Sequence, residues 1–244
     1  MKNFVLFMGC MLAVMIVFHY ATLKYLNPYK LIMVFGKKGS GKSTLLTKLS
    51  LQYQKKNIPI YSTEYVVGTY KINYEDIGFV EFPRNSVLLI DEVGMIWDSR
   101  RFKDFKPEVR DWFKLQRHRG ITVYLFSQTF DVDKKIRDLV DEMYLVEKRL
   151  RVFSYAKCIY KRIVLTTSEN SKEGESRISE DLVFAPWWLA FFGSRRLTFI
   201  PRYVKYFDSF TAPPLLVKEF ASVPMPEYEK VGLLSAVRDR VRRK

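Results

Sequence analysis

The sequence contains few of the residues that build disulfide frameworks or zinc sites. Its 244 residues include two cysteines and two histidines. Cys10 lies in an apolar run and Cys158 lies far downstream, and neither has a partner at the spacing of a metal site. These absences exclude a disulfide-stapled secreted domain and a protein-held zinc ion, and they fit a reducing cytoplasm.

Acidic residues are also scarce relative to basic ones. The chain has 41 Lys and Arg against 26 Asp and Glu, a formal net charge of +15. This excess favours a partner with negative charge, and both nucleic acid and an anionic membrane surface satisfy that condition. Hydrophobic residues make up 48% of the chain, which is enough to bury one α/β core and a smaller appendage.

One stretch of the chain is free of formal charge from Phe4 to Leu23. A helix needs roughly 20 apolar residues to cross the hydrocarbon core of a bilayer. We expect residues 1–26 to form a single transmembrane helix, because no small-residue cleavage site follows the run. A buried core helix is the alternative. Only Lys2 precedes the run, whereas several lysines follow it, which predicts that the bulk of the chain is cytoplasmic.

The most specific motif begins after the apolar run Leu31–Phe35, which is typical of a buried parallel strand. The next residues match G-x-x-x-x-G-K-[ST] and open an amphipathic helix. The expected nucleotide-binding residues are Gly36, Lys37, Lys38, Gly39, Ser40, Gly41, Lys42, Ser43 and Thr44. Glycines let backbone N–H groups surround phosphates, Lys42 supplies charge to the β and γ oxygens, and Ser43 is a magnesium ligand. ATP and Mg²⁺ are therefore the expected cofactors.

A second apolar run, Val87–Ile90, ends in two carboxylates and resembles a Walker B strand. We expect Asp91 to hold the magnesium shell together with Ser43, and Glu92 to orient and deprotonate the attacking water. Glu92 as a surface salt-bridge partner is the alternative. With Glu92 as the base, the sequence predicts ATP hydrolysis.

A third strand, Ile121–Phe126, ends near Gln128, whose side chain is a candidate sensor of the γ-phosphate or the lytic water. The alternative is that Gln128 caps a helix beginning near Asp131. Before this strand, helical spacing over residues 107–119 delivers Arg117 and Arg119 to a turn that Gly120 ends. These arginines either reach a neighbouring subunit's nucleotide as arginine fingers or complement the dipole of the helix.

Taken together, these motifs resemble the zonular occludens toxin family, which includes the gene I assembly proteins of filamentous phages and is similar to FtsK–HerA translocases. The resemblance covers about residues 31–147. Four segments carry the resemblance: G-K-K-G-S-G-K-S-T, V-L-L-I-D-E, F-K-L-Q-R-H-R-G-I-T-V-Y-L-F-S-Q and D-K-K-I-R-D-L-V-D-E-M-Y.

The resemblance implies a RecA/FtsK-like P-loop NTPase in the host inner membrane that extrudes single-stranded phage DNA while coat protein is added. It also implies a homo-oligomeric ring, with a hexamer as the candidate size, and other phage assembly proteins as partners. It strengthens the expected roles of Gln128, Arg117 and Arg119. One departure matters, because familiar members carry their membrane span after the ATPase core, whereas here the span precedes it.

The fold expected from these observations is α/β: a transmembrane helix over residues 1–26, a P-loop ATPase core with a mainly parallel sheet over 27–149, and a basic, aromatic region over 150–244. That last region reads as β-rich, with a polar loop from Thr166 to Glu180. The run 182–192, with Trp187 and Trp188, is too short to span. It suits either the membrane interface or core and subunit packing. A basic tail at 237–244 ends the chain.

Two other functions fit the same residues. One is a nonenzymatic membrane adaptor that binds nucleotide to control assembly, and the other is a DNA translocase of chromosomal or conjugative type. About seven residues separate the expected span from the first strand, so the linker reaches no more than about 25 Å and holds the ATPase close to the membrane.

Overall fold

The structure is a computed structural model that describes residues 2–97, 106–130, 132–167 and 176–207. It divides the chain into two compact units, Met1–Ser209 and Phe210–Lys244. The second unit, with the basic tail at 237–244, lies outside the described residues.

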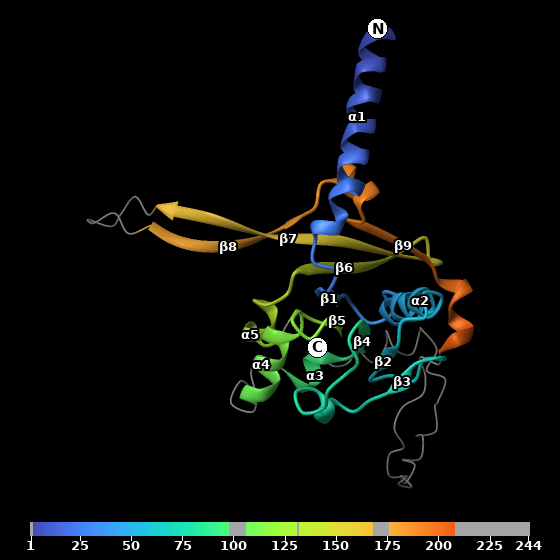
Figure 1. Cartoon of the computed structure of the whole chain (residues 1–244), viewed down its shortest axis with the longest axis vertical. Coiled ribbons are helices and arrows are strands. Elements are labelled where there is room, and N and C mark those ends of the chain that lie inside the picture. The colour runs from blue at the N-terminus through green and yellow to red at the C-terminus, as the bar shows by residue number, and fades with distance from the viewer. Residues whose placement is uncertain (1, 98–105, 131, 168–175, 208–244) are drawn as a thin grey trace, which may run out of the picture. The chain divides into compact units, whose positions relative to one another are not determined.

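A nine-stranded sheet organises the first unit, in the order β3-β2-β4-β5-β1-β6-β7-β8, with β9 paired to β7 (Figure 1). The strands are β1 Leu31–Phe35, β2 Ile60–Ser62, β3 Tyr70–Lys71, β4 Ser86–Ile90, β5 Ile121–Ser127, β6 Glu142–Arg149, β7 Phe153–Thr167, β8 Ser176–Phe184 and β9 Arg195–Phe199. The six strands from β3 to β6 pair in parallel, whereas β7 is antiparallel to β6, β8 and β9. The expected α/β class with a mainly parallel sheet is confirmed.

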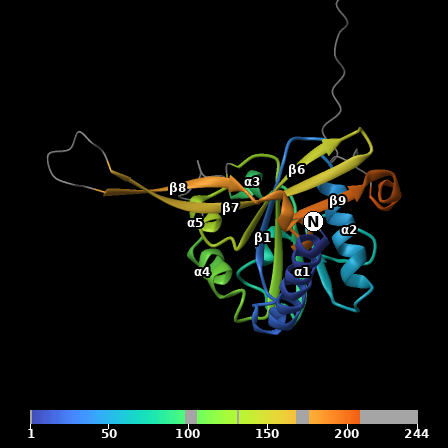
Figure 2. The same cartoon turned by 90° about the horizontal axis from the view of Figure 1, so that it is seen from above.

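Helices cover both faces of the parallel strands (Figures 1 and 2). The α-helices are α1 Lys2–Thr22, α2 Lys42–Gln54, α3 Val93–Ile96, α4 Pro107–Leu115 and α5 Lys134–Arg137. Short 3-10 turns occur at Leu23–Tyr25 (η1), Tyr74–Asp76 (η2), Trp187–Phe192 (η4), Ile200–Arg202 (η5) and Val204–Tyr206 (η6).

Side chains alternate between the two faces of the sheet along β1, so this strand contributes to a buried cluster on each face. Leu31 and Met33 join one buried cluster, to which α4 contributes Val109, Trp112 and Phe113. Ile32 and Val34 join the other cluster, to which α2 contributes leucines. Because both faces are covered, β1 is apolar at every position, as a strand inside a parallel sheet requires.

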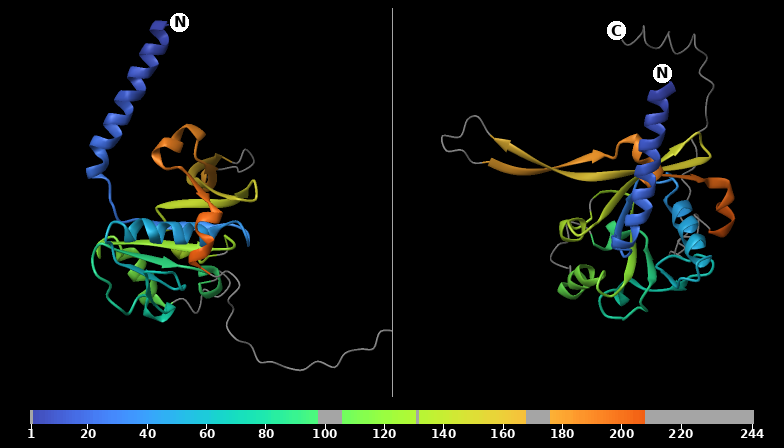
Figure 3. Two further views of the ribbon diagram at one scale, coloured as in Figure 1. Left: turned by 90° about the vertical axis from the view of Figure 1, so that its right-hand side faces the viewer. Right: turned by 45° about the horizontal axis from the view of Figure 1, so that its top comes forward.

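Helix α1 stands apart from the sheet, and none of its residues is buried (Figure 3). Residues Lys2–Tyr25 form one helix that is long and apolar enough to cross a membrane, by length and composition. Residues 26–30 then lead into β1, and the Asn27 side chain bonds Tyr29 in both directions, through Nδ2 to the carbonyl (2.6 Å) and through Oδ1 from the N–H (3.1 Å). The linker is therefore shorter than the seven residues expected and internally bonded.

The region after residue 150 belongs to the same sheet as the P-loop core. The expected boundary at 149/150 falls in the turn between β6 and β7, which pair from Met143↔Ile159 to Arg149↔Phe153. This pairing joins the β-rich strands to the core sheet, which is why Met1–Ser209 is one unit. Strands β7 and β8 extend into both ends of the loop expected at Thr166–Glu180 and project as a two-stranded ribbon (Figures 1 and 2). The rest of the expected loop, 168–175, lies outside the described residues.

The helix expected to run to Arg119 stops earlier. Helix α4 ends at Leu115, and a turn leads to Gly120, whose φ is +71°. The N–H of Gly120 donates to the carbonyl of Arg117 at 3.1 Å. A left-handed residue ends a helix readily when it is glycine. The stop signal at Gly120 and a turn that holds Arg117 and Arg119 agree with the expectation, whereas the helix itself ends four residues before Arg119.

The core clusters predict the effect of a matched pair of substitutions. Leu88→Ala removes a fully buried side chain from β4, and we expect the free energy of unfolding to fall by about 2–5 kcal/mol. Leu115→Ala removes a side chain that is 47% exposed, and we expect a change of about 0.5 kcal/mol or less. Urea unfolding in detergent, followed by tryptophan fluorescence, measures both. Equal losses in the two variants would contradict this packing.

Candidate nucleotide-binding site

The candidate site forms where three neighbouring parallel strands end. Strand β5 lies between β1 and β4, with Phe35 opposite Ser127 and Ile90 opposite Leu125. The segments that follow are the P-loop after β1, Asp91 and Glu92 after β4, and Gln128 after β5. Their common position at the carboxyl edge of the sheet is where open parallel sheets bind ligands.

Two glycines of the P-loop have no room for a side chain. A Cβ on Gly36 would lie 2.4 Å from the carbonyl oxygen of Val146 in β6, and one on Gly41 would lie 2.6 Å from Cβ of Ser154 in β7. Gly41 also has φ +97° and is the N-cap of α2. The loop is therefore tightly packed against β6 and β7, with the amino end of α2 directed at the site, where an anion is favoured.

Lys42 holds its charge inside the loop. The side chain is 7% exposed, and Nζ donates to the carbonyls of Gly36 at 2.8 Å and Lys37 at 3.3 Å. Burial lowers the pKa of this ammonium, while the nearby Glu92 and Asp91 carboxylates oppose the shift. Ser40 Oγ is buried without a hydrogen-bond partner among the described residues. A phosphate would satisfy both groups, so the loop fits the nucleotide that its sequence predicts.

The remaining P-loop residues divide by exposure. Lys37, Lys38 and Gly39 are exposed, Ser43 is half-buried, and Thr44 is buried. The first three, with Ser40, line a hollow of about 510 Å³ whose other wall is Leu145–Lys148 of β6. The hollow therefore extends the phosphate loop toward β6.

Asp91 is held in a buried position that suits a cation. Its N–H donates to Thr63 Oγ1 at 2.9 Å, its carbonyl accepts from the Tyr74 hydroxyl at 2.9 Å, and its Oδ1 accepts the N–H of Glu92 at 2.8 Å. Burial raises the pKa of this carboxyl to about 6. A divalent ion stabilises the charged carboxylate, so Asp91 fits the predicted magnesium role with Ser43.

Thr63 and Tyr74 were not singled out from the sequence. Thr63 directly follows Ser62, the last residue of β2, and this position after a strand was the signal available. Tyr74 lies in the 3-10 turn η2, and nothing in the linear pattern connects it to Asp91.

Glu92 and Gln128 contact each other across the end of the sheet. Gln128 Nε2 donates to Glu92 Oε1 at 2.7 Å. Glu92 has φ +50°, a left-handed conformation that costs a non-glycine residue roughly 1–2 kcal/mol. Such strain persists where the surroundings impose it, and it clusters at functional sites. The alternative for Glu92 was a role as a surface salt-bridge partner. None of the ion pairs among the described residues includes Glu92.

The alternative for Gln128 as a helix cap also differs from the structure. Helix α5 begins at Lys134, and its cap is Asp133, whose side chain accepts from the N–H of Lys135 at 2.7 Å. Gln128 instead donates to Glu92, the residue predicted to be the base.

The structure does not bring Arg117 and Arg119 to the P-loop of their own chain. Both are exposed and precede β5, at the amino edge of the sheet. The seven residues of β5 put roughly 20 Å between this edge and the carboxyl edge. An arginine finger from these residues could act only on a neighbouring subunit, so that role remains a prediction.

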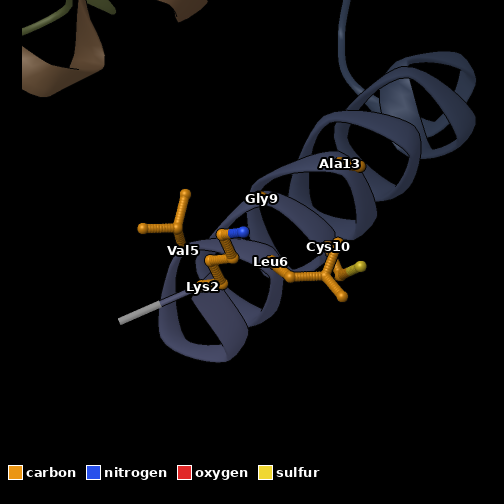
Figure 4. A pocket seen from close by; sticks show the side chains of 6 residues that line it. All are labelled: Lys2, Val5, Leu6, Gly9, Cys10 and Ala13. Carbon is orange, nitrogen blue, oxygen red and sulfur yellow. The ribbon is translucent and has the colours of Figure 1, made fainter.

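A second hollow, of about 660 Å³, lies against α1 (Figure 4). The described residues that line it all come from this helix: Lys2, Val5, Leu6, Gly9, Cys10 and Ala13. It is an open, mostly apolar helix face and carries none of the groups of the nucleotide site. Among the described residues, no group of three or more His, Cys, Asp or Glu side chains could hold a metal ion by itself.

Comparison with known families agrees with this geometry. A family model described as Zonular occludens toxin (Zot) matches residues 60–173. Over these residues, which make up less than half of its length, the chain is similar to the Zot family. The resemblance noted from the motifs is therefore confirmed, although the match begins after the P-loop and extends past 147 into β7 and beyond. No curated protein matches the sequence.

Three solved structures are similar in fold to this chain. The N-terminal domain of zonular occludens toxin from Neisseria meningitidis is 14% identical, with 66% of this chain and 97% of that chain covered and a TM-score of 0.39. The genome packaging NTPase B204 of Sulfolobus turreted icosahedral virus 2 in complex with AMP is 17% identical (51% and 78% covered, TM-score 0.40). The flagellar accessory protein FlaH of Methanocaldococcus jannaschii is 11% identical (64% and 90% covered, TM-score 0.40).

The crowding at Gly41 predicts a difference between two P-loop substitutions. Gly39 and Gly41 both have positive φ, but a Cβ on Gly39 has no atom within 4 Å. Both Gly→Ala changes therefore strain the backbone, and only Gly41→Ala also collides with Ser154. We expect Gly41→Ala to bind ATP roughly tenfold or more weakly than Gly39→Ala, equivalent to about 1.4 kcal/mol. Titration with a fluorescent ATP analogue measures this, and equal affinities would show that the contact with β7 is unimportant.

Proposed function

We propose that this protein is a membrane-anchored ATPase that drives assembly and extrusion of a filamentous phage across the host inner membrane. The observation that carries the proposal is the Glu92–Gln128 pair at the carboxyl edge beside the P-loop, in a chain whose residues 60–173 match the Zot model. A base held by a polar partner next to a phosphate loop supports turnover in addition to binding.

The chain's own residues would divide the work as follows. Bound ATP and Mg²⁺ supply the phosphoanhydride bond and the charge that neutralises its oxygens. The P-loop backbone and Lys42 hold the phosphates, and Asp91 and Ser43 hold the cation. Glu92 accepts a proton from the attacking water, and Gln128 fixes the orientation of the Glu92 carboxylate. Placing the base in advance lowers the cost of ordering it during reaction.

The cellular setting follows from α1 and the resemblance to the family. Helix α1 would cross the inner membrane once, with the ATPase in the cytoplasm, because basic residues follow the helix. The chain would act as a homo-oligomeric ring, with Arg117 and Arg119 reaching a neighbour's nucleotide. Coat protein, other assembly proteins and single-stranded DNA would be its partners, and the basic net charge suits the DNA.

The role of Glu92 predicts the outcome of one substitution. Glu92→Gln keeps the size of the side chain and an oxygen that can accept from Gln128, and it removes the base, so we expect ATP turnover to fall roughly 100- to 10,000-fold while ATP binding is retained. Glu108→Gln, at an exposed position of α4, is the matched control and should hydrolyse ATP normally. Phosphate release by the detergent-solubilised protein measures both.

Three outcomes separate the proposal from its rivals. Binding without turnover in the unmodified protein would favour the nucleotide-binding adaptor. Stimulation of turnover by double-stranded DNA, with no effect of coat protein, would favour a chromosomal or conjugative translocase. Stimulation by coat protein supports phage assembly.

The short linker predicts an effect of tether length. A flexible Gly/Ser insert after Leu26 moves the ATPase away from the membrane, so we expect ATP binding and turnover in detergent to be unchanged and phage titre to fall. The same insert after Met1 lengthens the chain before the span and should leave the titre unchanged. Normal titre from the Leu26 insertion would mean that closeness to the membrane is not required.

A further inference from the structure

The 3-10 turn η4, Trp187–Phe192, lies at the edge of the sheet where α1 enters. Strand β8 ends at Phe184, which pairs with Ile159 of β7, and Ile159 in turn lies opposite Met143, one residue after the start of β6. The chain therefore leaves β8 at the amino edge of the parallel strands, and the segment from α1 reaches that same edge at Leu31.

A direct contact confirms this placement. The ring of Phe192 lies 4.6 Å from the ring of His19 in an edge-to-face arrangement. His19 belongs to the last turn of α1, so η4 lies beside the end of the helix that would emerge from the membrane.

The base of this turn is firmly held. The N–H of Ala185 donates to the carbonyl of Cys158, and the N–H of Cys158 donates to the carbonyl of Ser194, both at 2.9 Å. Ala185 is buried, and its carbonyl also accepts from Arg195 at 2.6 Å. Residues 186–193 therefore form a loop whose two ends are fixed to one residue of β7.

The two tryptophans of this fixed loop project into solvent. Trp187 is 77% exposed and Trp188 is 48% exposed, whereas Trp97 and Trp112 are 7% and 2% exposed in the core. Two neighbouring indoles on one short loop present a large amphipathic surface, and tryptophan is enriched at the interface between water and hydrocarbon.

We propose that Trp187 and Trp188 insert into the interfacial layer of the bilayer that α1 crosses, forming a second attachment of the ATPase to the membrane. This rests on the membrane anchoring in the proposed function. Subunit packing, the other use of these side chains, requires a neighbouring copy at the level of the emerging helix, where the lipid head groups lie. The bilayer is the partner that α1 itself brings to this edge.

The second attachment would orient the nucleotide site. Strand β9 leads from η4 back along β7, and Phe199 pairs with Phe153 at the carboxyl edge. Ile200 follows, with Cδ1 3.7 Å from the Cβ position of Gly41, and Lys48 of α2 donates to the carbonyl of Leu197 at 2.8 Å. A single helix permits rotation about its own axis, whereas two attachments fix which way the P-loop faces.

Tryptophan fluorescence tests this directly. The sequence has four tryptophans, so replacing two of them leaves the emission of Trp187 and Trp188 alone. The variant Trp97→Phe/Trp112→Phe keeps only Trp187 and Trp188, and it is reconstituted in phosphatidylcholine vesicles with bromine on the acyl chains. We expect bromines near the head group to quench most of the emission, and bromines near the bilayer centre to quench less. Emission that is equal in brominated and unbrominated vesicles would overturn the proposal.

A second reporter separates this proposal from the anchoring on which it rests. Leu12→Trp in a chain with all four tryptophans changed to Phe reports on α1 itself. Deep quenching there, without quenching of Trp187 and Trp188, would overturn the second attachment and leave the span intact; no quenching at Leu12→Trp would contradict the span.

The double variant Trp187→Ser/Trp188→Ser tests the consequence. We expect ATP turnover in detergent and the thermal melting temperature to be unchanged, and phage titre to fall. If instead the variant changes the oligomer mass measured in detergent, the loop is a subunit contact and the proposal is wrong.

Discussion

The parallel pairing of β5 between β1 and β4 is the constraint on which the candidate site depends. It places the end of β5 between the P-loop and the Asp91–Glu92 pair, so that Gln128 can contact Glu92 at 2.7 Å. It also lets the N–H of Gly36 donate to the carbonyl of Ser127 at 3.2 Å. A register shift of one residue would turn every side chain of β5 to the opposite face and separate these groups.

The two edges of the sheet carry different tasks. The carboxyl edge holds the P-loop, Asp91 and Glu92, and the amino edge receives α1 and carries η4 and the exposed arginines 117 and 119. Strands β7 and β9 run between the two edges, and Ser154 of β7 and Ile200, which follows β9, pack on the P-loop. The region after residue 150, expected to be an appendage, thus forms one wall of the P-loop and connects that loop to the edge that α1 reaches.

Local patterns in the sequence predicted much of this arrangement. The P-loop, the strand before Asp91 and the strand before Gln128 are continuous segments in which spacing and composition suffice. The contacts of Thr63 and Tyr74 with Asp91 were not predictable in the same way. Thr63 lies 28 positions and Tyr74 lies 17 positions before Asp91, and only the fold brings them together. The close approach of Ser154 to Gly41, 113 residues apart, has no local signal either.

The sequence by itself determined the P-loop motif, the carboxylates after the second apolar run and the long apolar helix, because glycine spacing, an apolar run before carboxylates and a charge-free stretch of helix length are properties of neighbouring residues. Only the tertiary structure decided which of the candidates act together. It joined Glu92 to Gln128, separated Arg117 and Arg119 from the P-loop of their own chain, and brought Phe192 beside His19, 173 positions away in sequence. The physical reason is that strand order and register set these distances, and both depend on long-range pairing that no local segment encodes.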